Sequence, residues 1–481
     1  MLNISLETLI AVAPQLGQEQ ETREPIREAQ DWGFASRIQR EASVGLPLRP
    51  ERTPFFCVAP LDILVERGPD GTPRFQLAEL NGTGIGGLTN MCEPAVEATW
   101  WSMAEIPGRL PETNEDSPPL VVVASSGRED PSNPRVNKLY YEKILYADAL
   151  RHGFDTLRGE KTDILGVDQI SQQFNWRPRR PTVLLGHFRE LAEAMTCDRE
   201  GRLWLGSAQV SATINDRFCL NLYNRFGQQI DLDRWFTANR CFVAGGDKGT
   251  AYDLSNRFMA SQPDNEFPHV NKRIHFALAH TREQLIGTVL DWVRSGRRTV
   301  IKPQATGLGH GIEFFLSADE SEAEIIQRID HSLAFIAKNY DFQGGGLPYT
   351  VCEFLDTARV LDPSHELYDH KFELRIVVYR DGEWLRPFPS IAKVSSERYL
   401  PGVLDRSMLI NNVTASACET KKPGRDYILP LSNSQTLKAL GIDEPTLVEL
   451  CRYCTSYVHS VIEGMAHEKS SQQFHAALRV A

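Results

Sequence analysis

Hydrophobic residues in the first part of the chain predict one β-hairpin set among helices. Two β-like runs, at 55–66 and 74–81, are joined by residues 67–73, which are rich in glycine and proline. This pattern is typical of a hairpin. Amphipathic helical spacing precedes the hairpin at 25–44 and follows it at 93–106. We therefore expect a small hairpin-centred unit at the start of the chain.

The next region alternates strands with helices. A polar, proline-rich stretch at 107–118 predicts a linker. After it, helical spacing at 137–153 is flanked by short apolar runs at 120–126, 162–167, 182–186, 201–206 and 210–218. Such alternation predicts an open α/β domain over residues 119–235.

The remaining residues predict an α+β region that contains two more hairpins. Apolar runs lie on either side of a glycine-rich loop within 298–315, between predicted helices at 281–295 and 318–339. A β-like run at 348–355 follows, and then runs at 371–379 and 383–394 joined by Arg380-Asp-Gly382, where Asp-Gly is a strong hairpin signal. A C-terminal helix is expected at 444–463.

Composition narrows the class of protein. A length of 481 residues predicts about three domains, or one large enzyme of packed subdomains. The net charge of -11 and the lack of a long basic run argue against a nucleic-acid partner. Nine dispersed cysteines predict reduced thiols in a cytoplasmic protein, and Cys451 and Cys454 fit helix packing. No signal peptide or membrane-spanning run is recognisable, so we expect no membrane partner.

The glycine-rich loop is the first candidate for chemistry. Lys302 leaves an apolar run beside Gly307, Gly309 and Gly311. One ammonium group and several backbone N–H groups can surround a polyphosphate there. Neither a P-loop nor a dinucleotide fingerprint fits, because both require a helix after the loop and here a strand follows. The alternative is a plain hairpin with a flexible glycine tip.

The first hairpin is a candidate metal site. Glu79 and Asn81 are two residues apart, so their side chains share one face of a strand, and Asp62 on the paired strand can join them. Carboxylate and amide oxygens suit Mg²⁺, with Mn²⁺ as an alternative. The other interpretation is a solvated hairpin edge.

Two further segments are candidates for binding substrate. Residues 82–90 include Gly86 and Gly87 and lead into a helix, which predicts either an anion site or a flexible turn. The turn that ends with Arg217 lies where a strand can end facing a ligand, although a charged turn is the alternative.

A cationic pair completes the candidates. Arg375 and Lys393 lie on neighbouring predicted strands. The alternative for Arg375 is a structural ion pair with Glu353 or Glu373. No general base is identifiable, and His310 and His370 are the nearest candidates.

The order of these residues resembles the ATP-grasp superfamily, in which two α+β subdomains grip ATP and activate a carboxylate as an acyl phosphate. The likeness covers about 235–420 and 55–90. The residues that match the family pattern in order are Lys248, Lys302, Glu353, Arg375, Lys393 and Asn412. The metal hairpin that closes the family pattern stands instead at the front of this chain, which implies a circular permutation.

The resemblance implies a fold and three domains. It predicts an ATP-grasp fold with a preceding open α/β domain, circularly permuted. Residues 1–106 would contribute helices and the permuted metal hairpin, 119–235 the α/β substrate domain, and 236–481 the nucleotide-binding subdomains with a C-terminal helix.

The resemblance also implies a function: an ATP-dependent ligase that joins a carboxylate to an amine and releases ADP and phosphate. The substrates would be small molecules, either amino acids or a peptide, with a homodimer as one option for the assembly. A small-molecule phosphotransferase and a non-catalytic nucleotide-binding protein are the alternatives. The implied metal ligands are Asp62, Glu79, Asn81 and Asn412; the nucleotide residues are Lys248, Lys302, the loop glycines, Glu353 and Asp356; Arg375 and Lys393 act on the transferred phosphoryl group.

Overall fold

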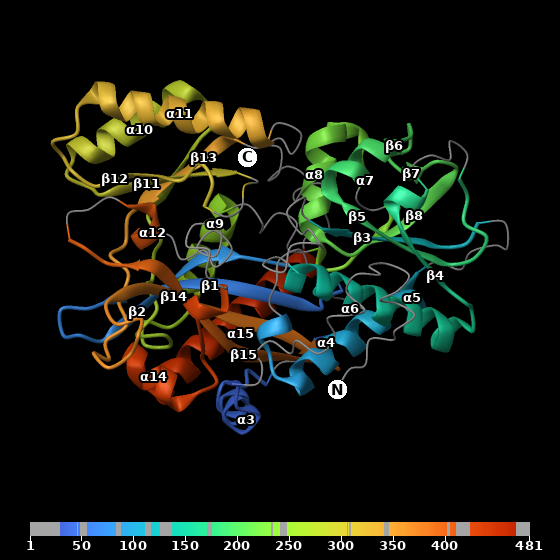
Figure 1. The fold of residues 1–481 in the computed structure, drawn as a ribbon, viewed down its shortest axis with the longest axis horizontal. Coiled ribbons are helices and arrows are strands. Elements are labelled where there is room, and N and C mark those ends of the chain that lie inside the picture. The colour runs from blue at the N-terminus through green and yellow to red at the C-terminus, as the bar shows by residue number, and fades with distance from the viewer. Residues whose placement is uncertain are drawn as a thin grey trace.

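In the computed structural model, the described residues form three β-sheets with helices packed against them (Figure 1). Within the described residues, no helix is both long and apolar enough to cross a membrane. The structure describes residues 29–45, 47–48, 55–82, 88–110, 117–125, 137–170, 176–231, 234–240, 248–304, 306, 309–340, 346–401, 405–409 and 424–467.

A five-stranded antiparallel sheet combines strands from widely separated parts of the sequence. Its order is β16-β15-β14-β1-β2. The strands are β1 (Val58–Arg67), β2 (Pro73–Leu80), β14 (His370–Asp381), β15 (Trp384–Arg398) and β16 (Ile428–Pro430). The predicted first hairpin is confirmed, and so is the one at Asp381-Gly382. In the first turn Gly71 has a φ of 81°, and Asp70 Oδ1 accepts a hydrogen bond from the Thr72 N–H at 3.1 Å.

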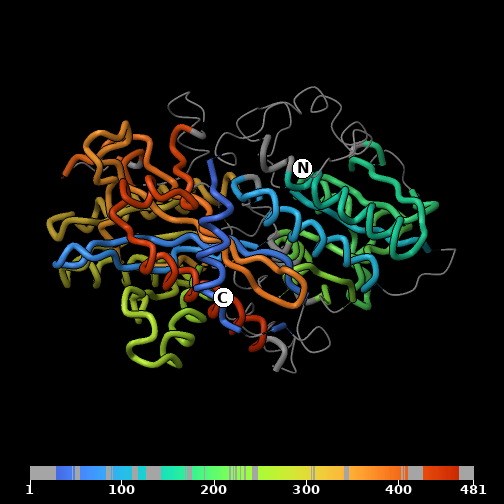
Figure 2. The backbone as a smooth tube through the Cα atoms, turned by 90° about the horizontal axis from the view of Figure 1, so that it is seen from below, coloured from blue at the N-terminus to red at the C-terminus, as the bar shows by residue number. Residues whose placement is uncertain are grey.

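Helices from both ends of the described chain cover the apolar face of this sheet. Leu61, Ile63 and Leu374 belong to the largest hydrophobic cluster, together with side chains of α15. Arg37 of α3 pairs with Glu444 of α15 at 2.6 Å, and Figure 2 shows these two helices side by side. The helices of this part are α3 (Trp32–Glu41), α12 (Arg406–Leu409), α14 (Ser434–Leu440) and α15 (Glu444–His467).

A four-stranded antiparallel sheet carries the predicted glycine-loop hairpin. Its order is β10-β13-β11-β12. One face packs against the two long helices α10 and α11, while Val300, Cys352 and Phe354 on the other face join the core of the five-stranded sheet. The elements are α9 (Lys248–Ser261), β10 (Phe276–Ala279), α10 (Arg282–Arg294), β11 (Thr299–Gln304), β12 (Glu313–Phe315), α11 (Glu322–Tyr340) and β13 (Gly346–Glu353).

The third sheet has the open α/β arrangement expected from the alternation of strands and helices. Strands β4, β5, β3 and β8 run parallel, with α6 on one face and α7 and α8 on the other. The elements are α4 (Glu93–Ala104), α5 (Ile106–Arg109), β3 (Leu120–Ser125), α6 (Asn137–Gly153), β4 (Asp163–Gly166), β5 (Thr182–His187), α7 (Phe188–Ala194), β6 (Met195–Cys197), β7 (Leu203–Leu205), β8 (Ala208–Thr213), α8 (Asp216–Phe226) and β9 (Phe236–Thr237).

Two expectations for this region need correction. The run predicted as a strand over 210–218 ends at Thr213, and α8 begins at Asp216. The side chain of Asn215 explains the change, because its Oδ1 accepts a hydrogen bond from the Phe218 N–H at 3.3 Å, as residues do at the start of helices. The expected linker 107–118 also begins inside α5.

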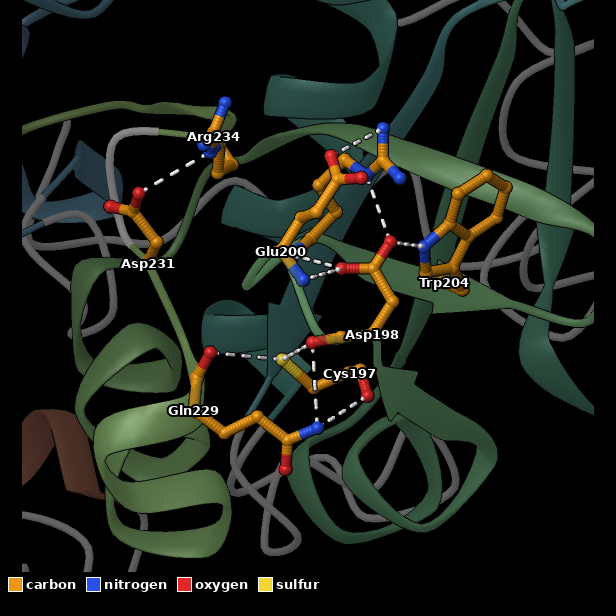
Figure 3. A network of polar contacts seen from close by, with 8 residues as sticks. Cys197, Asp198, Glu200, Trp204, Gln229, Asp231 and Arg234 are labelled. Atoms are coloured by element: carbon orange, nitrogen blue, oxygen red, sulfur yellow. Dashed lines mark hydrogen bonds and ion pairs between the residues drawn. The ribbon is translucent and has the colours of Figure 1, made fainter.

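One carboxylate organises the hairpin formed by β6 and β7 (Figure 3). Asp198 accepts hydrogen bonds from the Glu200 N–H at 2.9 Å, from Arg202 Nε at 2.8 Å and from Trp204 Nε1 at 2.9 Å. Gln229 Nε2 donates to the Cys197 carbonyl at 2.8 Å. These contacts close a turn and fasten it to the next segment, so the cluster serves the fold.

A buried asparagine attaches the end of the α/β unit to the five-stranded sheet. Asn239 is 0% exposed and has a φ of 55°, in the left-handed region that asparagine tolerates better than most residues. Its Oδ1 accepts from the Cys57 N–H at 2.7 Å, its Nδ2 donates to the Val58 carbonyl, and its own N–H donates to the Phe55 carbonyl at 3.1 Å. The start of β1 is thereby fixed against the third sheet.

Candidate functional site

Polar side chains converge where β1 meets its two neighbours. Asp62 lies opposite Arg375 of β14 on one side and opposite Glu79 of β2 on the other. Glu373, two residues before Arg375 on β14, lies opposite Lys393 of the next strand, β15. Strand register alone therefore brings together residues that the sequence separates by up to several hundred positions.

Asp62 is the centre of this group. It is 4% exposed, and its two oxygens meet Arg375 Nε at 2.7 Å and Arg375 Nη2 at 2.8 Å. Lys393 Nζ lies 3.0 Å from Oδ2. Burial alone would raise the pKa of the Asp62 carboxyl, but the charges of Arg375 and Lys393 outweigh burial and hold that pKa well below its usual range. Asp62 is therefore an anion shared by two cations.

Glu373 belongs to the same group and was named from the sequence only as an alternative partner for Arg375. The structure pairs Arg375 with Asp62, and Lys393 Nζ contacts Glu373 as well as Asp62. Burial raises the pKa of Glu373 even with Lys393 beside it. The two-residue spacing of Glu373 and Arg375 on one strand is the sequence signal that places both in the site.

Helix α9 brings a lysine and a tyrosine to the same place. Lys248 Nζ lies 3.6 Å from Glu79 Oε1. Lys302 Nζ, on β11, donates to the Tyr252 hydroxyl at 2.8 Å, and that hydroxyl donates to the Ala78 carbonyl of β2 at 3.0 Å. Tyr252 thus links the four-stranded sheet to the five-stranded one.

The charge of Lys302 is favoured by its neighbours. Burial would lower the pKa of its ammonium, but Cys352, Tyr252 and Glu79 nearby raise it above its usual range. Sequence reasoning missed Tyr252, although its spacing of four from Lys248 puts both on one face of a helix.

Asn81 carries a buried acceptor in this site. Its Nδ2 donates to Asp62 Oδ2 at 3.3 Å and its backbone N–H donates to the Pro60 carbonyl at 2.8 Å. Its Oδ1 is buried and has no hydrogen-bond partner within the described part of the chain. A buried acceptor without a donor is costly, so this oxygen suits a cation or a ligand donor.

The oxygen atoms at this site are of the type that Mg²⁺ binds, but few carboxylates are grouped with them. Asn81 Oδ1 and the Glu79 carboxylate are the hard oxygen ligands that this ion takes. Among the described residues, no three His, Cys, Asp or Glu side chains are grouped as a metal site. A cation bound here would therefore use an amide oxygen and leave positions for phosphate oxygens and water.

The glycine loop joins β11 and β12. Gly309 and Gly311 both have a φ of 70°, which favours glycine, and a Cβ on Gly311 would meet the Ile336 side chain at 2.7 Å. Gly307 lies outside the described residues. The His310 ring contacts the Tyr340 hydroxyl of α11, which attaches the loop to that helix.

The predicted acidic residues at the end of β13 and just after it lie away from the Asp62 group. Glu353 pairs with Thr299, three positions along β11 from Lys302, which is roughly 10 Å at strand spacing. Asp356 forms an ion pair with the buried Lys371. Neither has a described contact with the Asp62 group, and their nucleotide role stays a prediction.

The predicted substrate residues are less informative. Gly86, Gly87 and Asn412 lie outside the described residues. Arg217 is at the start of α8, and its side chain also falls outside them. The nearby strand ends carry other polar groups, because Ser125 Oγ lies 3.2 Å from His187 Nδ1 at the ends of β3 and β5.

His370, the second candidate base, forms a hydrogen bond with the backbone. His370 Nδ1 lies 2.8 Å from the Ser395 carbonyl, so this nitrogen carries a proton and donates it. A neutral His370 can then accept a proton at Nε2 alone.

Comparisons with known proteins give weak similarities. No family model matches the chain, and no curated protein is similar to it in sequence. A glutathione synthetase-like effector from Globodera pallida is similar in structure at 14% identity and a TM-score of 0.33, over 77% of this chain and 79% of the effector. D-alanyl-alanine synthetase A from Vibrio cholerae is similar at 10% identity and a TM-score of 0.24, over 71% of this chain and 99% of that enzyme.

Proposed function

We propose that this protein is an ATP-dependent ligase that joins a carboxylate to an amine and releases ADP and phosphate. TM-scores below 0.5 are too low to support this, so the proposal rests on the residues of the site. The supporting observation is the arrangement around Asp62. Lys248, Arg375 and Lys393 contact carboxylates, Lys302 contacts the Tyr252 hydroxyl, and the buried amide oxygen of Asn81 lacks a donor among the described residues.

The four cations suit a polyphosphate. Lys248 and Lys302 approach from α9 and β11, and Arg375 and Lys393 from the five-stranded sheet. Positioned cations stabilise the charge of a transferring phosphoryl group without covalent chemistry. In the proposed reaction the two lysines hold the nucleotide phosphates, while Arg375 and Lys393 hold the phosphoryl group that moves to the substrate carboxylate.

Glu79 and Asn81 would hold the metal ion. When bound, Mg²⁺ neutralises charge on the nucleotide phosphates. The chain supplies the orientation: Glu79 is drawn toward Lys248, and Asn81 is fixed by its backbone bond to Pro60. The loop that contains Gly309 and Gly311 would exclude water, which protects an acyl phosphate from hydrolysis before the amine attacks.

We further propose that the fold is a circularly permuted ATP-grasp. The position of β1 between β2 and β14 supports this, because the hairpin with Glu79 and Asn81 completes a sheet built from the 370–430 region. The third sheet would then be the domain that helps to bind the amine substrate, with amino acids or a peptide as the substrate class.

The test is incubation with Mg-ATP and a pool of amino acids, followed for ADP, phosphate and a new product mass. The ligase predicts ADP, phosphate and a condensed product together. ADP together with a stable phosphorylated acceptor would contradict the ligase and indicate a phosphotransferase. Release of AMP would contradict both of these activities.

A pair of variants connects the activity to the site. Glu79→Gln should lower turnover at least 100-fold, because the metal loses a charged ligand while the side-chain volume is kept. Glu322→Gln, on an exposed pair with Arg294, is the matched control and should leave turnover unchanged. Full activity in Glu79→Gln would refute the assignment of the site.

A further inference from the structure

The carboxylate of Asp62 is held by four donor contacts, most of them on one oxygen. Arg375 gives it two hydrogen bonds, at 2.7 and 2.8 Å, Lys393 Nζ lies at 3.0 Å, and Asn81 Nδ2 donates at 3.3 Å. An ionised carboxylate has about four lone-pair sites. Three of these contacts fall on Oδ2, the oxygen that faces Asn81, and one falls on Oδ1. Two cations therefore neutralise the carboxylate and Oδ2 is fully occupied, which separates Asp62 from the other predicted ligands.

Asn81 shows the opposite condition. A carboxylate accepts hydrogen bonds and cannot donate them, so the amide end facing Asp62 is the NH₂ group. The oxygen of Asn81 therefore points away from Asp62, and it is the buried atom without a partner among the described residues. The contact with Asp62 decides which end of the amide faces the site.

We propose that Asp62 is a positioning residue of this site and not a metal ligand. Its contact with Asn81 presents the amide oxygen to the metal. The metal is then bound from Glu79 and Asn81. This inference rests on the proposed function, and it follows the general pattern in which outer groups fix the orientation of metal ligands.

The consequence is a specific pattern of energetic coupling. If Asp62 acts on the metal only through Asn81, then removing Asp62 causes no further loss of metal affinity in a chain that already lacks Asn81. If Asp62 binds the metal itself, the two losses are independent and multiply. A double-mutant cycle separates these cases.

The experiment measures Mn²⁺ binding in the presence of adenylyl imidodiphosphate, by the EPR signal of free Mn²⁺. The chains compared are the wild type, Asp62→Asn, Asn81→Ala and the double variant. Each single change should weaken Mn²⁺ binding by about 10- to 100-fold. The double variant should lie within about threefold of Asn81→Ala. Losses that multiply, or wild-type affinity in Asp62→Asn, would overturn the positioning role.

Asp330→Asn is the matched control. Asp330 receives the same two-bond contact from Arg282, at 2.6 and 2.8 Å, but both side chains are more than 40% exposed and belong to α11 and α10. The Mn²⁺ affinity of the Asp330→Asn chain should equal that of the wild type. An equal loss in Asp330→Asn would mean that the cycle reports general destabilisation, which would also overturn the proposal.

A crystal structure of the wild-type chain with Mn²⁺ and the same analogue covers the case in which Asp62→Asn does not fold. The anomalous signal should place Mn²⁺ on Asn81 Oδ1, with Asp62 still contacting Arg375. A Mn²⁺–Asp62 oxygen bond of about 2.2 Å would overturn the proposal. A wild-type chain that binds neither Mn²⁺ nor the analogue refutes the proposed function itself, and this inference falls with it; binding with multiplied losses refutes the positioning role alone.

Discussion

Replacing Asn239 should destabilise the protein strongly, although this residue carries no chemistry. Asn239→Ala removes the acceptor of the Cys57 N–H and the donor to the Val58 carbonyl, and both of these residues are buried. A buried backbone group left without a partner costs about 1–3 kcal/mol. The φ of 55° adds roughly 1 kcal/mol for alanine. We expect a total loss of about 3 to 7 kcal/mol in the free energy of unfolding.

Asn239→Gly separates the two contributions. Glycine adopts a positive φ without strain but makes neither side-chain hydrogen bond, so it should be about 1 kcal/mol more stable than the alanine variant and still well below the wild type. Asn339→Ala is the control, because Asn339 is exposed on α11 and donates only to the Phe335 carbonyl within its own helix.

The assay is urea unfolding followed by tryptophan fluorescence, with the midpoint and slope fitted for each variant. The control should stay within about 0.5 kcal/mol of the wild type. If Asn239→Ala and Asn239→Gly also stay within about 0.5 kcal/mol of the wild type, the attachment of the third sheet to β1 does not depend on this side chain, and the reasoning is refuted. Equal losses in the two variants would refute the strain contribution alone.

Three further predictions concern the site and the fold. Lys302→Met should weaken binding of an ATP analogue about 10- to 100-fold in equilibrium dialysis, since a charge-assisted hydrogen bond is lost; unchanged affinity would exclude Lys302 from the nucleotide site. Gly311→Ala should lower the melting temperature by several degrees, because its Cβ would meet Ile336 at 2.7 Å with φ at 70°, and an unchanged melting temperature would contradict that conformation. Asp198→Asn should be less stable than the wild type at pH 7. Burial would raise the pKa of Asp198, but its bonds from Arg202 and Trp204 outweigh this and lower it in the folded state, so the stabilisation is present above the unfolded pKa of about 4 and is lost as pH falls toward the folded value; a difference in urea midpoint that does not shrink between pH 7 and pH 3 would contradict this sign.

Much of the secondary structure could be predicted from the sequence, because each element had a local cause. The hairpin turns contain Gly71 and Gly382, both with positive φ, and apolar alternation defined the flanking strands. Short elements escaped prediction: β10 has four residues and α14 seven, too few for periodicity to separate them from loops. Helix α8 was missed because its start depends on a hydrogen bond that the Phe218 N–H donates to the Asn215 side chain, and a hydrophobic pattern does not report such a bond.

The sequence alone determined which residue types were available for phosphate and metal chemistry. Lys302 before glycines, and Glu79 two residues before Asn81, are local patterns with a physical meaning. They carry no information about their partners, since a strand pattern does not state which other strand lies beside it.

Only the tertiary structure decided how those residues are used. Placing β1 between β2 and β14 puts Asp62 opposite Arg375 and next to Lys393, so that two cations neutralise its carboxylate, while the oxygen of Asn81 is buried without a donor among the described residues. The difference between a metal ligand and a positioning residue depends on strand register and burial, which long-range packing sets. That is why Asp62, Glu79 and Asn81 look alike in the sequence and differ in the folded chain.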